Sequence, residues 1–152
     1  MKRLLERLTG GVSYLRMMLV IAVLMLSGCA SSLEAEKIPG VDLADLDSFY
    51  VRKLPADGRG VERLIADELT MMGKRATSGA EQQPPYQVDA IVTYQDKWMW
   101  DITMYMINLS IQVRDAENDL VLARGNSMRS SLARKSPEDM VKEVLVQIFS
   151  ER

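Results

Sequence analysis

Residues 88–113 read VDAIVTYQDKWMWDITMYMINLSIQV, and this stretch decides the fold because it holds two rows of alternating apolar residues. The rows are Val88, Ala90, Val92 and Tyr94, then Tyr105, Ile107, Leu109, Ile111 and Val113. A period of two is typical of strands with one buried face. A tight turn at Met99-Trp100 would place both rows on one side of a sheet. We therefore predict an antiparallel hairpin that pairs Tyr94 with Tyr105, Val92 with Ile107, Ala90 with Leu109 and Val88 with Ile111.

Further elements can be assigned on both sides of this hairpin. Residues 48–54 read as a strand, and the apolar spacing over 61–73 predicts a helix, which Asp57 or Gly58 can cap. After a turn at 115–119, residues 120–130 read as another strand. A second helix begins after Ser136, the expected N-cap, with Pro137 at its first position. The prediction for residues 48–152 is an α+β domain: one mainly antiparallel four-stranded sheet, β-α-β-β-β-α, with two helices on one face.

The N-terminus has the layout of a bacterial lipoprotein leader. A basic segment precedes an apolar run at 17–26, which is too short for a bilayer core that needs about 20 helical residues. Leu26-Ser27-Gly28-Cys29 resembles the lipobox of lipoprotein signal peptidase. The resemblance implies that residues 1–28 are a signal peptide and that Cys29 is acylated. Because Ala30 rather than Asp follows, similarity to enterobacterial sorting implies anchoring at the periplasmic face of the outer membrane.

Residues 29–47 are predicted to be the lipidated N-terminus and a flexible tether. They are rich in small and acidic residues and contain the turn signal Pro39-Gly40. Asp42, Asp45 and Asp47 lack the spacing and the glycine of a calcium loop. A solvated linker is therefore the preferred interpretation of these acids.

The composition offers little for catalysis. The chain has no histidine, one cysteine and a formal net charge of −2, so the commonest general base is missing and no nucleic-acid footprint is apparent. Ser130, Ser131 and Lys135 do not form a Ser-x-x-Lys site, and Asp96 and Asp101 read as exposed hairpin acids. No glycine-rich phosphate loop is present. We expect no enzyme activity, no cofactor, no metal and no nucleic-acid partner.

The candidate interaction residues surround the two tryptophans, Trp98 and Trp100. Tryptophan is enriched at binding hot spots and membrane interfaces, so the pair either covers the end of the core or touches a partner, a saccharide or a bilayer. The sheet face opposite the helices is expected to carry an apolar strip of Ile91, Met99, Ile102, Met104 and Met106. Such a strip either docks a partner or second copy, or is covered by the tether or the loop 79–87.

Four stretches give the domain a family resemblance. Phe49-Tyr50-Val51, the helix 61–73, the strand 88–94 and residues 111–116 leading into Leu120-Val121 resemble a family of small Gram-negative envelope lipoproteins of mostly unknown function. The resemblance covers residues 48–150 and extends distantly to the TolB N-terminal domain and to LptE-type lipoproteins. It implies a domain that binds and assembles rather than catalyses, but a shared fold does not assign a partner.

The sequence therefore predicts a non-catalytic, membrane-anchored envelope lipoprotein. It is expected to dock to an envelope partner or to self-associate through Trp98, Trp100, Ile102, Met104 and Met106. The alternative is a small-ligand or glycan-binding lipoprotein in which Trp98 and Trp100 form a stacking platform.

Overall fold

The computed structural model describes residues 16–19 and 31–150. Residues 16–19 form a short helical stretch, whereas the predicted lipobox and Cys29 lie outside the described residues. The chain divides into two compact units, Met1–Ala30 and Ser31–Arg152. Both clusters of buried apolar side chains lie between Leu43 and Ile148, so the second unit encloses its own core.

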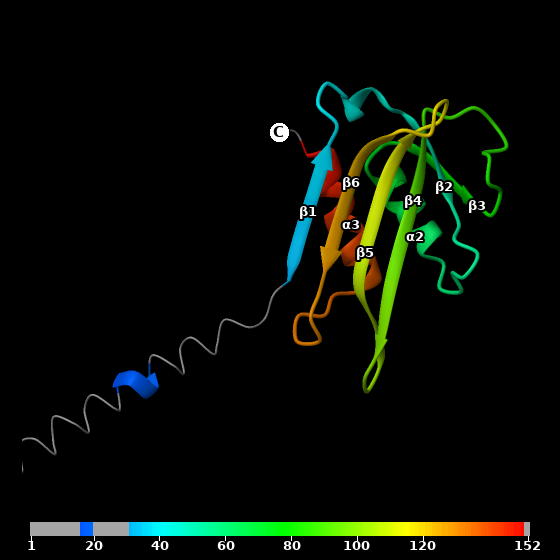
Figure 1. The fold of residues 1–152 in the computed structure, drawn as a ribbon. Coiled ribbons are helices and arrows are strands. Elements are labelled where there is room, and N and C mark those ends of the chain that lie inside the picture. The colour runs from blue at the N-terminus through cyan, green and yellow to red at the C-terminus, as the bar shows by residue number, and fades with distance from the viewer. Residues whose placement is uncertain (1–15, 20–30, 151–152) are drawn as a thin grey trace, which may run out of the picture. The chain divides into compact units, whose positions relative to one another are not determined.

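This unit is built on one mixed sheet of six strands (Figure 1). The strands are β1 (Ser32–Lys37), β2 (Ser48–Arg52), β3 (Arg75–Gly79), β4 (Ala90–Trp100), β5 (Met104–Asp115) and β6 (Val121–Met128). Their order is β1-β6-β5-β4-β2-β3. β2 runs parallel to both β3 and β4, and the other neighbours are antiparallel. The helices of this unit are the 3-10 helix η1 (Leu43–Asp45), α2 (Val61–Met71) and α3 (Pro137–Phe149).

The prediction of a four-stranded, mainly antiparallel sheet is therefore wrong. The two strands that were missed, β1 and β3, are the edges of the sheet. Edge strands bury little side chain, so β1 (SLEAEK) and β3 (RATSG) lack a clear apolar row. The predicted flexible tether is also wrong for much of its length, because β1 pairs with β6 at every residue and Leu43 of η1 is buried in the core.

The β4–β5 hairpin is longer than the one predicted. Tyr94 pairs with Ile111 rather than with Tyr105, and Trp100 pairs with Met104, so the turn lies at residues 101–103. The register differs by an even number of residues, and Tyr94 and Ile111 therefore stay on the same buried face. The neighbouring pairs are displaced in the same way: Val92 faces Val113 and Ala90 faces Asp115.

A β-bulge changes the side-chain alternation near the end of this hairpin. Lys97 pairs with Asn108 and Trp98 with Met106, so Ile107 is an extra residue on β5. An extra residue reverses which face the following side chains occupy. Met106 consequently joins the core at 1% exposure, and its predicted place on an exposed apolar strip is wrong.

The helices α2 and α3 cover one face of the sheet (Figure 1). The helix predicted after Ser136 is present: the Ser136 Oγ accepts the backbone N–H of Asp139 at 3.1 Å, and Pro137 is the first helical residue. Gly125 of β6 permits the close approach of α3, since a Cβ at this position would lie 2.8 Å from Ile148 and 2.9 Å from Val144.

The start of α2 is fixed by the buried carboxylate of Asp57. It accepts the backbone N–H groups of Arg59, Gly60 and Val61 at 2.6, 3.0 and 2.9 Å, and the hydroxyl of Tyr94 at 2.6 Å. Burial by itself would raise the pKa of Asp57, but these hydrogen bonds outweigh it and the pKa is lowered. The predicted capping role of Asp57 is confirmed, although Gly60, with a φ of 75°, is the residue that directly precedes the helix.

The opposite face of the sheet is polar rather than methionine-rich. Ile91, one member of the predicted strip, is buried there with Tyr50 and Val88 in a small cluster. Along β1, β4, β5 and β6, polar side chains alternate with the core residues: Glu34, Glu36, Thr93, Gln95, Asn108, Ser110, Gln112, Arg114, Arg124 and Asn126. This open face can therefore form hydrogen bonds and ion pairs but offers little apolar surface.

Candidate functional site

The two tryptophans have different environments near the end of the β4–β5 hairpin. Trp98 is partly buried against the core, and its Nε1–H donates to the Asp96 carboxylate. The guanidinium of Arg59 lies 4.5 Å from the centroid of its ring. Trp98 is therefore a packed side chain with a cation over its ring, as in the interpretation that a tryptophan covers the end of the core.

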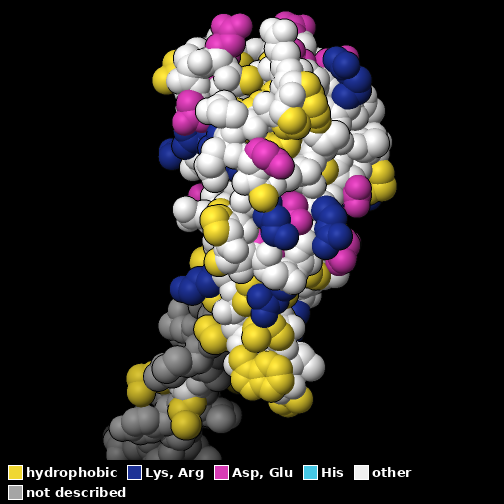
Figure 2. Space-filling view, turned by 90° about the vertical axis from the view of Figure 1, so that its right-hand side faces the viewer, with side chains coloured by type: hydrophobic (Ala, Val, Ile, Leu, Met, Phe, Trp, Pro, Cys, Tyr) yellow, Lys and Arg dark blue, Asp and Glu magenta, His cyan; other side chains and the backbone are white. Residues whose placement is uncertain are grey.

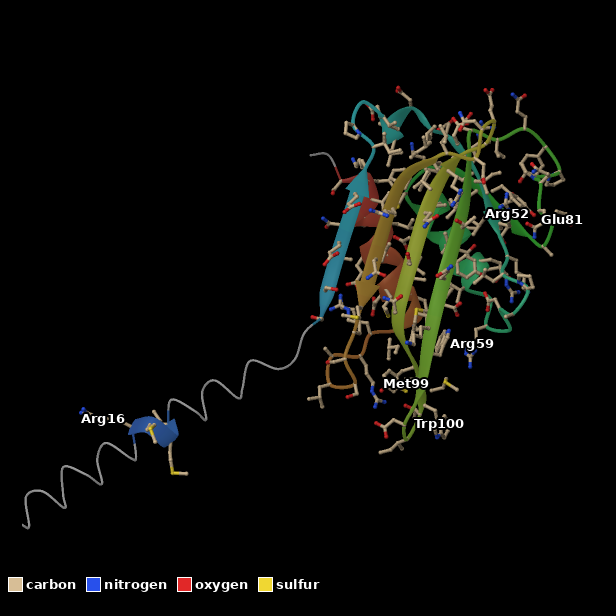
Figure 3. The ribbon with its side chains drawn as sticks, in the orientation of Figure 1. Arg16, Arg52, Arg59, Glu81, Met99 and Trp100 are labelled. Atoms are coloured by element: carbon tan, nitrogen blue, oxygen red, sulfur yellow. The ribbon has the colours of Figure 1, made fainter. Side chains whose placement is uncertain are left out.

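The residues beyond Trp98 form an exposed apolar tip. Met99 and Trp100 lie at the far end of the hairpin (Figure 3). Trp100 is 68% exposed and Ile102, within the turn, is 87% exposed. Met104 is also exposed. Trp100, Ile102 and Met104 are thus brought together as predicted, but not on a sheet face.

The connection between β6 and α3 packs beside this tip. Arg134 donates to the carboxylate of Asp101 at 2.9 Å and to the hydroxyl of Thr103 at 3.1 Å, and its guanidinium lies 3.8 Å from the centroid of the Tyr105 ring. The same connection carries Leu132, which is 83% exposed. We define the hairpin-end surface as the exposed apolar side chains at this end of the domain: Met99, Trp100, Ile102, Met104, Met128 and Leu132.

A largely buried carboxylate holds the base of this connection. Glu143 of α3 accepts hydrogen bonds from Arg129 and Lys135, and from the hydroxyl of Ser127 at 2.6 Å. The side chains of Arg129 and Glu143 are each only 12% exposed. Burial would raise the pKa of Glu143, but the hydrogen bonds from Arg129, Lys135 and Ser127 outweigh it and lower the pKa.

The start of β1 lies at the same end of the domain as the hairpin-end surface. One row of paired residues crosses the sheet there: Ser32 faces Met128, Met128 faces Asn108, and Asn108 faces Lys97. Figure 1 shows the beginning of β1, the hairpin tip and the β6–α3 connection at the lower end of the sheet. Figure 2 shows hydrophobic side chains gathered at this end, next to Lys and Arg side chains.

A second candidate site is a groove of about 420 Å³ on the open face, where β2, β4 and β5 meet. Its lining includes Arg52, Gln95, Gln112 and Arg114. The Nε of Arg52 is buried without a hydrogen-bond partner among the described residues, whereas Arg114 is held by Asp119 at 3.2 Å. The groove therefore offers guanidinium and amide donors, which suit carboxylate or hydroxyl groups of a ligand.

The described part of the chain shows no cluster of three metal-ligating side chains. None of its helices is long and apolar enough to cross a bilayer. Acylation of Cys29 lies outside the described residues and stays a prediction.

Leu132 and the groove arginines were not singled out from the sequence, because only the folded chain brings them beside the other site residues. An isolated leucine within the basic segment 129–135 was the one available signal for Leu132.

No family model and no curated protein match the chain. A PelC dodecamer from Paraburkholderia phytofirmans matches 81% of this chain and 100% of its own, with a TM-score of 0.59 and 12% identity. A PDZ domain protein from Parabacteroides distasonis matches 82% of this chain and 37% of its own, with a TM-score of 0.54 and 11% identity. TolB from Acinetobacter baumannii matches 78% of this chain and 31% of its own, with a TM-score of 0.42 and 16% identity.

At these identities the PelC and PDZ domain protein matches show a shared fold and nothing about activity. The predicted similarity to TolB is confirmed only as a distant and partial structural similarity. Membership of an envelope lipoprotein family stays a prediction.

Proposed function

We propose that this chain is a non-catalytic envelope lipoprotein, anchored by acylated Cys29 at the periplasmic face of the outer membrane, whose domain self-associates there. The observation that carries the proposal is the start of β1 at Ser32, three residues after Cys29. Three extended residues span at most about 10 Å. An anchor on Cys29 would therefore hold a folded sheet edge, rather than a loose segment, next to the bilayer. Two or more acyl chains make release negligible.

Three of the four carboxylates with lowered pKa values, Asp57, Asp89 and Glu143, support a structural rather than a catalytic use. Asp57 caps α2, and Glu143 accepts three side-chain donors. Asp89 accepts the N–H groups of Asp47 and Ser48 and the hydroxyl of Ser48, and these hydrogen bonds lower its pKa. Perturbed groups at an active site converge on a cleft. These three carboxylates lie on different elements, and none of them lines the groove.

The sheet edges support self-association. In the described unit, β1 and β3 each have a neighbour on one side only, and an unpaired edge can accept a strand from another chain. Pairing β1 of one copy with β3 of the next would be a heterologous contact, which closes into a ring when the rotation fits. The PelC structure, covered over its whole length by this fold, is a dodecamer.

Engineered cysteines test this edge-to-edge arrangement. Glu34 of β1 and Thr77 of β3 lie in the middle of the two edge strands, and the only natural cysteine is Cys29. Oxidation of intact cells that carry Glu34→Cys together with Thr77→Cys is expected to give a ladder of cross-linked species. The control pair Glu34→Cys and Glu138→Cys, with the second cysteine on α3, should stay monomeric. Equal cross-linking of both pairs, or none in either, contradicts the arrangement.

The anchor is tested separately by metabolic labelling with an alkyne-bearing palmitate. Wild type is expected to incorporate the label and to fractionate with the outer membrane. Cys29→Ala should remain unlabelled and keep its leader, because the modification and the cleavage both need the thiol. Labelling of Cys29→Ala at the level of wild type would refute the role of Cys29.

The groove favours a second candidate function, the binding of an anionic saccharide. Two arginines and three glutamines line it, whereas the predicted stacking platform is incomplete because Arg59 lies over the ring of Trp98. Titration calorimetry with polygalacturonate oligomers is expected to show binding that Arg52→Ala abolishes. Neutral cello-oligosaccharides serve as the control ligand, and equal heats for both ligands would argue against the groove.

A further inference from the structure

The hairpin-end surface concentrates exposed apolar area that the fold does not use. Trp100, Ile102 and Leu132 are 68%, 87% and 83% exposed. Elsewhere on the described unit, exposed apolar residues such as Met71 and Leu120 stand on separate elements. Scattered apolar residues need no explanation, but a group of them gathered at one end of a domain (Figure 2) indicates an interaction.

The position of this surface matches the reach of the proposed anchor. From the row of Ser32 and Lys97, β4 continues for three residues to Trp100, which is about 10 Å of strand. From the same row, the chain between Ser32 and Cys29 also extends at most about 10 Å. Cys29 and Trp100 can therefore lie at a similar distance beyond this row of the sheet.

The charges beside the tip suit an anionic surface. The basic side chains at this end are Arg59, Lys97, Arg129, Arg134, Lys135 and Lys142, and the carboxylates are Asp96, Asp101, Glu138, Asp139 and Glu143. Three of these carboxylates are already engaged: Asp96 by Trp98, Asp101 by Arg134, and Glu143 by Arg129 and Lys135. Lys97 is exposed and has no ion-pair partner among the described residues. Lys and Arg near a membrane are attracted to anionic lipid headgroups.

We infer that the hairpin-end surface is a second, non-covalent membrane contact, which seats in the headgroup region of a bilayer that contains anionic phospholipid. The inference rests on the proposed anchoring through Cys29. The indole of Trp100 suits this region because it has an apolar body and a polar N–H. With one covalent and one non-covalent contact at the same end, the sheet stands upright on the membrane. Both free edges and the open-face groove then remain accessible from the side.

The two tryptophans allow a direct test on the mature lipidated protein in vesicles. Trp98→Phe leaves Trp100 as the only tryptophan, and Trp100→Phe leaves Trp98 as a matched internal control. The vesicles contain phosphatidylethanolamine and phosphatidylglycerol with brominated acyl chains. We expect the emission of Trp100 to shift to the blue and to be quenched at least twofold, whereas that of Trp98 changes little. Equal quenching of the two variants, or none in either, overturns the inference.

Two further outcomes are decisive. A blue shift of Trp100 that depends on protein concentration in the absence of vesicles means that a second copy covers the surface, and it overturns the membrane contact. The mass of the N-terminal peptide is measured on the same sample. Acylated Cys29 with unquenched Trp100 refutes this inference alone, while unmodified Cys29 refutes the proposed anchor.

A vesicle-binding assay on acyl-free residues 30–152 tests the surface without the anchor, since this unit encloses its own core. Burying one large apolar side chain changes a partition coefficient about tenfold or more, so Ile102→Asp should weaken binding to phosphatidylglycerol vesicles by about that factor. Leu120→Asp changes an exposed leucine in the turn at the opposite end of the sheet and should leave binding unchanged. Equal losses in the two variants, or no loss in Ile102→Asp, overturn the inference.

Discussion

Replacing Glu143 with glutamine should destabilise the domain more than any other change of one charge on α3. The glutamate accepts hydrogen bonds from Arg129, Lys135 and Ser127. The side chains of Arg129 and Glu143 are each 12% exposed. Removing one partner leaves a nearly buried guanidinium without its counter-charge, which costs 3–5 kcal/mol in a fully buried pair. Because the amide keeps one acceptor oxygen, we expect Glu143→Gln to lower the free energy of unfolding by about 2–4 kcal/mol.

The same substitution should change how stability depends on pH. The pKa of Glu143 is lowered from its ordinary value of 4.5 in the folded chain. A carboxyl group with a lowered folded pKa stabilises the fold above its unfolded pKa and loses that contribution as the pH falls through the folded value. The difference between wild type and Glu143→Gln is therefore complete at neutral pH and shrinks below pH 4.5.

Urea denaturation followed by circular dichroism, at neutral pH and at a series of acid pH values, measures both effects. Glu138→Gln is the control, because Glu138 is exposed in the first turn of α3 and should change stability by less than about 1 kcal/mol. A loss below about 1 kcal/mol in Glu143→Gln, or a difference from wild type that does not change with pH, would refute the reasoning.

Four other substitutions probe the fold by urea denaturation. Asp57→Ala should lower the unfolding free energy by about 2–4 kcal/mol, because three backbone N–H groups and the Tyr94 hydroxyl lose their acceptor. An effect below about 1 kcal/mol, the size of one hydrogen bond, would contradict the capping role. Gly125→Val should cost about 1–3 kcal/mol through overpacking against α3, and unchanged stability would disprove the close approach. Met106→Lys should prevent folding, whereas Met104→Lys should fold normally; the reverse result would refute the bulge.

The sequence predicted the elements with strong local signals and missed those set by tertiary context. Ser136 and Pro137 gave the start of α3, and the helical spacing after Asp57 gave α2. The edge strands β1 and β3 bury too little to leave an apolar row, so β1 falls within the predicted tether and residues 75–78 have no predicted element. One extra residue, Ile107, moved Met106 into the core. The apolar pattern of β5 alone does not reveal this bulge, because a bulge is defined by the pairing of β5 with β4.

The candidate site was predicted only in part, because tertiary contacts bring some of its residues together. Trp100, Ile102 and Met104 are neighbours in sequence, and a hairpin tip exposes them whatever the register. Leu132 and Arg134 reach the same end only because the β6–α3 connection folds back onto the hairpin. The groove combines β2 with β4 and β5, and no local pattern joins Arg52 to Arg114.

The central claim is that Cys29 carries the membrane anchor of a domain that begins three residues later. Mass spectrometry of the N-terminal peptide, taken from protein extracted from the outer-membrane fraction, tests it most directly. We predict a mature chain that begins at Cys29 and carries at least two acyl chains on this residue. A chain that retains residues 1–28, or one that begins at an unmodified Cys29, would contradict the account.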